Sequence, residues 1–159
     1  QIAIPLDRMD DEYIKNPQKW NAKGIARFMY ILGPASSLFD IITFVVLFTV
    51  FKYNSPAVGS YFQTGWFIMG LLSQTLIVHL IRTAKVPFIE SRASMPLLVS
   101  TVLICVVGFI LPYTFIGSAL QMSPVSLWYL PCVITMLLLY ALAVQIIKKF
   151  YIAKYHEWI

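Results

Sequence analysis

Asp40 is the one acidic residue that this 159-residue chain places inside a long apolar run. A carboxylate at the centre of a membrane helix costs about 2.5–3.5 kcal/mol to insert, so such residues usually face other helices and often lie on ion or proton pathways. Gln74 lies in the next apolar run at nearly the same depth. We therefore expect Asp40 to face the interior of a helix bundle and to form a hydrogen bond with Gln74. These two residues are the candidates for a cation pathway.

A second group of acids stands near the N-terminus, within six positions: Asp7, Asp10, Asp11 and Glu12. One interpretation is a cation site or a docking surface for another domain. The other is a solvated loop whose charges compensate a helix dipole. Asn16 and Pro17 follow with the pattern of a helix start, so we expect a short amphipathic helix there.

Basic residues recur every four positions after this helix start and cluster again near the C-terminus. Side chains of this kind at a membrane surface attract anionic lipids, at roughly 1 kcal/mol per residue. We expect contact with lipid headgroups from Lys19, Lys23, Arg27, Lys148 and Lys149.

Other chemistry is missing from the sequence. There is no phosphate-binding Gly-Lys-Ser/Thr loop, no cluster of histidines and carboxylates with metal-ligand spacing, and no nucleophile beside a base. We therefore expect no catalytic residue, no cofactor and no certain metal ligand in this chain. Cys105 and Cys132 fall in different apolar runs, which favours packing roles over a disulfide or a zinc site.

The elements that carry these residues must be membrane helices. Hydrophobic residues make up 59% of the chain and charged residues only 12%, against about 25% charged in a soluble domain. Four apolar windows are long enough to cross a bilayer as helices: 30–52, 61–83, 96–115 and 127–150. The sequence thus predicts an all-α, integral membrane four-helix bundle in which short links make consecutive helices antiparallel neighbours. We expect no nucleic-acid partner, because no basic patch interleaved with aromatic residues remains outside the spans.

Small and polar residues form stripes on two of these spans. One stripe holds Gln63, Trp66, Gly70, Ser73, Gln74 and Ile77; the other holds Thr101, Cys105, Gly108 and Pro112. Such stripes allow close helix packing, although the first is equally compatible with an ion pathway. His79 falls on the opposite face of its span, near the membrane surface, where we expect an interfacial polar tip.

The basic residues also predict an orientation. Eleven of the twelve lysines and arginines lie before the first span, in the second link or after the last span, and only Lys52 lies on the opposite side. This bias places both ends of the chain in the cytoplasm. We expect two parts: residues 1–29, a cytoplasmic segment, and residues 30–159, the transmembrane domain with a short C-terminal tail along the membrane surface. Because the chain begins at Gln1, we expect it to be a fragment of a larger protein.

Several strings of residues resemble one family, the bacterial P-type magnesium-transporting ATPases. The acidic segment is similar to the cytoplasmic loop after their sixth helix, and the first two spans are similar to their seventh and eighth helices. The strings that carry the resemblance are 4–12, 16–20, 27–29, 33–40, 62–67, 71–79, 82–83, 86–89 and 91–93.

The resemblance implies that this chain runs from the end of the sixth helix through the tenth helix of such a transporter in the bacterial inner membrane. It implies that the whole protein uses ATP to import Mg2+, and that its catalytic domains lie upstream of this inactive fragment. It also implies that Asp7, Asp10, Asp11 and Glu12 belong to a loop coupling the phosphorylation domain to the membrane, and that Gln74 is a candidate cation ligand. The expected partners are the lipid bilayer and the remaining helices and cytoplasmic domains of the same transporter.

Two alternatives follow from the residues alone. The chain could be a self-contained small four-helix transporter that uses Asp40 as a proton-coupled site. It could also be a non-catalytic membrane subunit that only docks partners. The strong charge bias argues against the first alternative. Such small transporters often insert in both orientations and assemble as antiparallel dimers, which requires a weak charge bias.

Overall fold

The computed structural model describes Asp7, residues 22–88 and residues 90–155. In these ranges every regular element is a helix, and one isolated bridge joins Pro87 and Ser91, which confirms the all-α prediction. The elements, in chain order, are α2 (Ala22–Thr49), η2 (Pro56–Val58), α3 (Gly59–Ile81), α4 (Met95–Ile110), η3 (Leu111–Tyr113), α5 (Phe115–Ala119) and α6 (Tyr129–Tyr155).

Four helical stretches are long and apolar enough to cross a membrane, as predicted: Ala22–Thr49, Pro56–Ile81, Met95–Tyr113 and Tyr129–Tyr155. The first and last extend further than the apolar runs indicated. α2 already includes Lys23 and Arg27, and α6 continues through Lys149 and Lys154. Lysine and arginine are good helix formers, so helical structure continues from the apolar run into its polar flank.

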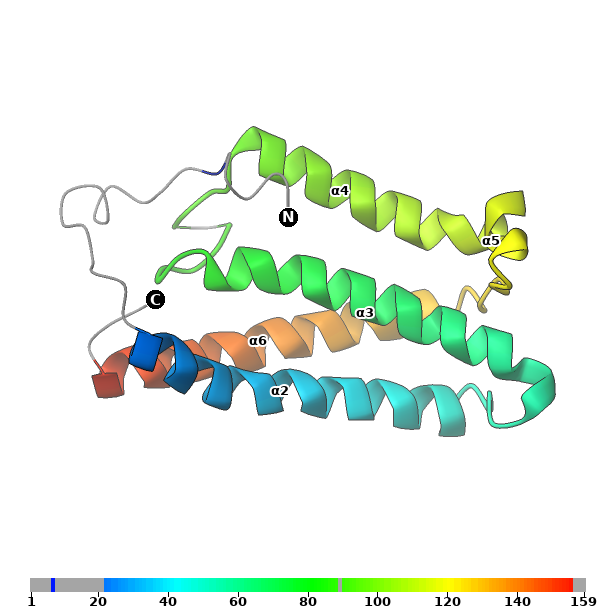
Figure 1. The fold of residues 1–159 in the computed structure, drawn as a ribbon, viewed down its shortest axis with the longest axis horizontal. Coiled ribbons are helices and arrows are strands. Elements are labelled where there is room, and N and C mark those ends of the chain that lie inside the picture. Colours follow the sequence, from blue (N-terminus) through cyan, green and yellow to red (C-terminus); the bar gives the residue numbers. More distant parts are fainter. Residues whose placement is uncertain (1–6, 8–21, 89, 156–159) are drawn as a thin grey trace.

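α3 is the central helix of the bundle. It packs against α2, α4 and α6, and α2 also packs against α6 (Figure 1). The described residues show no comparable contact between α4 and α6, so the expectation that these consecutive helices are neighbours is wrong. The link between them is held on α3 instead, because Ser60 hydrogen-bonds Ser123 at 2.7 Å and the Ser123 N–H donates to Thr64 at 3.0 Å.

Two apolar clusters form the core. One lies around Tyr129, which is fully buried with Leu47, Ile68 and Val133; its hydroxyl donates to the Gly65 carbonyl at 2.9 Å. The second, towards the other end of the bundle, comprises Leu32, Leu80, Tyr140 and Val144. Each cluster joins α2, α3 and α6, so these three helices form the packed unit onto which α4 adds.

The start of α2 and the end of α6 lie at the same end of the bundle (Figure 1). The buried Tyr151 hydroxyl donates to the Gly24 carbonyl at 3.3 Å, and its ring packs edge-on against Phe28. Residues 151–155 are therefore a continuation of α6 against α2. Residues 156–159 lie outside the described residues.

Gly117 provides a test of the link that follows α4. An added Cβ there would lie 2.2 Å from the Leu111 carbonyl oxygen and 2.8 Å from Pro112 Cα, and backbone atoms cannot rotate away. We expect Gly117→Ala to lower the free energy of unfolding by about 1–3 kcal/mol, measured by reversible denaturation in mixed micelles. Gly33→Ala is the control, because nothing lies within 4 Å of its added Cβ. Equal stability of the two variants would contradict the packing described here.

Candidate functional site

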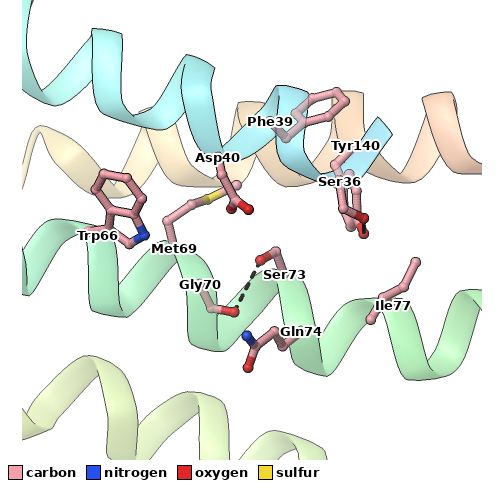
Figure 2. Close-up of a pocket in the computed structure, with 10 residues that line it drawn as sticks. All are labelled: Ser36, Phe39, Asp40, Trp66, Met69, Gly70, Ser73, Gln74, Ile77 and Tyr140. Atoms are coloured by element: carbon pink, nitrogen blue, oxygen red, sulfur yellow. Dashed lines mark hydrogen bonds between the residues drawn. The ribbon is translucent and has the colours of Figure 1, made fainter. Parts of the chain in front are cut away.

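A pocket of about 240 Å3 opens where α2, α3 and α6 meet (Figure 2). α3 contributes six of the ten lining residues, and these include most of the predicted stripe, so the prediction that this stripe faces a neighbouring helix is confirmed. The lining residues are Ser36, Phe39 and Asp40 from α2, Trp66, Met69, Gly70, Ser73, Gln74 and Ile77 from α3, and Tyr140 from α6.

Helical spacing explains why these polar groups come together. Ser36 and Asp40 are four residues apart, and Gly70, Ser73 and Ile77 follow one another at intervals of three and four, so each set lies along one helix face. Gly70 and Ser73 are small and leave space at the point where Asp40 approaches α3. The pocket therefore forms where the face of α2 that carries Ser36 and Asp40 packs against the polar stripe of α3.

Asp40 and Gln74 both line this pocket but do not pair. Figure 2 shows the carboxylate of Asp40 directed towards α3, whereas the amide of Gln74 extends on the other side of that helix. The structure gives no hydrogen bond between these two described side chains, and both are exposed. The predicted Asp40–Gln74 hydrogen bond is therefore wrong. Gln74 follows Ser73 by one residue, which turns its side chain about 100° around α3.

The polar partner on α6 is Tyr140, which the sequence analysis missed. Its buried hydroxyl hydrogen-bonds Ser36 at 2.8 Å, and its ring packs against Phe39 with centroids 5.2 Å apart. Tyr140 is one of three hydroxyl-bearing residues in the apolar run of residues 127–150, together with Tyr129 and Thr135, so the sequence did not single it out. Ser36 and Tyr140 thus hold α2 and α6 together at the floor of the pocket.

The chemistry of the pocket is that of oxygen ligands. The lining residues carry one carboxylate, three hydroxyls and one side-chain amide, and hard divalent cations take oxygen ligands. Among the described residues, no group of three histidine, cysteine, aspartate or glutamate side chains could hold a metal ion. The pocket can therefore attract a cation through Asp40 but does not by itself enclose one.

Lys148 is buried between α6 and the end of α3. Its side chain is 2% exposed, and its ammonium donates to the carbonyls of Leu80, Thr83 and Lys85 at 3.0, 3.1 and 2.9 Å. The prediction that Lys148 contacts lipid headgroups is wrong. Helices leave their last carbonyls without intrahelical donors, and the ammonium from α6 satisfies those at the end of α3.

Of the other residues predicted to contact lipid headgroups, three lie in the described part of the chain and one does not. Lys23 and Lys149 are exposed, and the Arg27 guanidinium lies 4.3 Å from the centre of the Tyr155 ring, so all three lie near the end of the bundle where α2 begins and α6 ends. Lys19 lies outside the described residues, as do Asp10, Asp11 and Glu12.

His79 occupies a position that the sequence analysis did not expect, whereas Gly108 lies where it was predicted. His79 does face away from the pocket, but it is buried, with Nε2 2.8 Å from the Thr101 hydroxyl on α4, so it is not an interfacial tip. Gly108 packs beside Leu71 of α3, which confirms the predicted packing stripe on α4. Asp7 is bonded to Arg82 and to the start of α4.

Comparison with known proteins agrees with this helical architecture. The family described as "Cation transporting ATPase, C-terminus" matches residues 1–150. The chain is 46% identical over 158 residues to a protein named "Magnesium-transporting ATPase, P-type 1" from Salmonella typhimurium, covering 99% of this chain. It is 48% identical over 155 residues to the protein of the same name from Escherichia coli K12, covering 98% of this chain. The chain spans 17% of the length of each of these relatives.

Lys148 and its neighbour provide a matched test of the cap on α3. Lys148→Met removes the donor from three carbonyls, and leaving even one buried acceptor unsatisfied costs about 1–3 kcal/mol. Lys149→Met removes the same charge from an exposed position. We expect only the Lys148 variant to lower the free energy of unfolding, by at least this amount, in the same denaturation assay. Equal effects of the two variants would show that charge alone, and not the cap, is responsible.

Proposed function

Because this chain belongs to the C-terminal family of the cation-transporting ATPases, we propose that it is the membrane support bundle of a bacterial P-type ATPase that imports Mg2+. The observation that carries the proposal is the identity of 46–48% to magnesium-transporting ATPases over almost the whole chain. A self-contained small transporter or a separate docking subunit would not be expected to match 17% of a much longer protein so completely.

In this proposal this chain and the rest of the transporter have different roles. ATP binding and phosphoryl transfer belong to the domains outside this chain, and Mg2+ is the cargo. The four helices supply a rigid scaffold, since α2, α3 and α6 share two apolar clusters. The scaffold positions the remaining membrane helices, which are its main partners together with the bilayer.

We place both ends of the bundle on the cytoplasmic side of the inner membrane. Eleven of twelve lysines and arginines fall on that side. The contact between Tyr151 and Gly24 supports this arrangement, because it brings the start of α2 and the end of α6 together. Exposed Lys23 and Lys149 at that end would contact anionic lipids.

Asp40 and Gln74 are proposed to contribute to the cation pathway separately rather than as a pair. Asp40 presents its carboxylate at the mouth of the pocket (Figure 2). A cation there would need further oxygen ligands, which the remaining helices of the transporter would supply. Gln74, on the neighbouring surface of α3, would face a different helix. The acids Asp10, Asp11 and Glu12 would belong to the loop that couples the phosphorylation domain to this bundle.

A chimeric transporter tests the proposed function. This chain would replace the corresponding 17% of the Escherichia coli relative. We expect the chimera to restore Mg2+ uptake in an Escherichia coli strain lacking its own importers, because the bundle keeps its contacts with the other helices. The 159-residue chain alone should neither hydrolyse ATP nor form a phosphoenzyme. Mg2+-stimulated hydrolysis by the isolated chain would overturn the proposal.

The role of Asp40 can be tested in the same chimera. Asparagine lacks the negative charge that would attract Mg2+, so Asp40→Asn should raise the Mg2+ concentration for half-maximal uptake about tenfold or more, which corresponds to a loss of about 1.4 kcal/mol or more. Ser100→Ala on α4, outside the pocket, is the control. Unchanged Mg2+ dependence with normal expression would exclude Asp40 from the cation pathway and leave it a packing role.

A further inference from the structure

Three backbone carbonyls converge on one point at the end of α3. They belong to Leu80, Thr83 and Lys85, and their oxygens lie 3.0, 3.1 and 2.9 Å from the ammonium nitrogen of Lys148 on α6. Leu80 and Thr83 are buried, and Lys148 is only 2% exposed. The three carbonyls therefore form a carbonyl cage around a positive charge that water hardly reaches.

The end of α3 favours a positive charge at this point. Leu80 lies in the last turn of α3, which ends at Ile81, and Thr83 and Lys85 follow directly. The last carbonyls of a helix lack intrahelical donors, and the C-terminus of the helix dipole carries partial negative charge. A cation in the carbonyl cage is thus attracted by the helix as a whole as well as by the three oxygens.

The loop that carries two of these carbonyls has hydrogen bonds of its own. The Lys85 N–H donates to the Thr83 hydroxyl at 3.1 Å. The Val86 N–H donates to the Glu90 carboxylate at 2.7 Å, and the Glu90 N–H donates back to the Val86 carbonyl at 3.0 Å. None of these bonds involves Lys148, so the carbonyl cage does not depend on the ammonium for its shape. It has the character of a preformed binding site.

Neutral carbonyl oxygens in this arrangement suit a monovalent cation. Carbonyl oxygens bind K+ in channels by replacing its hydration shell, and NH4+ has the same charge and nearly the same radius. Mg2+ gives up its water reluctantly and is usually bound through carboxylates, so the carbonyl cage does not suit it. The ammonium of a lysine is a compact charge with three donors, which matches the three acceptors.

We propose that the carbonyls of Leu80, Thr83 and Lys85 are a binding site for a monovalent cation of the size of K+ or NH4+, and that the ammonium of Lys148 is its built-in occupant. α6 thereby brings its own cation to the end of α3, and no ion from solution is needed to join the two helices. None of these four residues lines the pocket that contains Asp40. The site holds whether or not the chain is part of a Mg2+ importer.

The cation preference of Lys148→Ala tests the site. The chain is unfolded reversibly in mixed micelles with the chloride salt of K+, NH4+, Na+ or choline at the same ionic strength. Lys85 is exposed, so the emptied cage is open to solution on that side. We expect K+ and NH4+ to lower the equilibrium constant of unfolding about tenfold relative to choline, once the cation reaches about ten times its dissociation constant. Na+ should have a smaller effect.

Lys149→Ala is the matched control, because it removes the same charge from an exposed neighbour. This variant and the unmodified chain keep Lys148 in the carbonyl cage and should not distinguish the four salts. Equal stability of Lys148→Ala in all four salts would overturn the proposal, as would the same cation preference in Lys149→Ala.

A second measurement covers the case in which Lys148→Ala does not fold without a cation. Alanine keeps the Cβ of Lys148 but lacks the rest of the stem and the ammonium, and propylammonium supplies those groups. We expect propylammonium to restore the helical content of Lys148→Ala, as K+ and NH4+ should, whereas tetramethylammonium has no N–H donor and should not. Recovery with propylammonium alone would show a cap that needs the lysine stem and would overturn the cation site, as would no recovery with any of the cations.

Discussion

The hydrogen bonds of the Lys148 ammonium are the interaction on which one end of the described bundle depends, the end where α3 and α6 both finish. From α6 the ammonium donates to the carbonyls of Leu80, at the end of α3, and of Thr83 and Lys85 in the loop that follows. The last carbonyls of a helix have no intrahelical donors. Burial of such a charge is costly unless its donors are used, and here all three N–H groups have acceptors. Because the carbonyls come from α3 and the loop after it, the end of one helix, the following loop and α6 cannot be positioned independently.

The loop held by Lys148 also explains why α4 can lie outside the packed unit of α2, α3 and α6. α4 packs on α3, and the His79–Thr101 hydrogen bond and the close approach of Gly108 to Leu71 fix this pair. Its start is held through Ser94 by Asp7. The bundle therefore combines a core of apolar contacts with a loop held by charges.

The pocket where α2, α3 and α6 meet combines a hydrogen-bonded pair of side chains with an exposed carboxylate. Ser36 and Tyr140 join two helices at its floor, while Asp40 remains exposed at its mouth. A carboxylate in this position is costly in lipid. Under the proposed function, a neighbouring helix of the whole transporter, of whose length this chain spans 17%, would cover this carboxylate.

Four membrane helices, their approximate positions and the polar stripe on α3 followed from the sequence alone, because apolar length and helical periodicity are local properties. The strings shared with magnesium-transporting ATPases likewise identified the family. Tertiary structure alone decided which groups meet. Lys148 looked like a surface lysine next to Lys149, His79 like an interfacial tip, and Gln74 like a partner of Asp40. The position of each of these side chains depends on how one helix is rotated relative to another, and that of Lys148 also depends on the carbonyls at the end of α3. No local sequence pattern determines either.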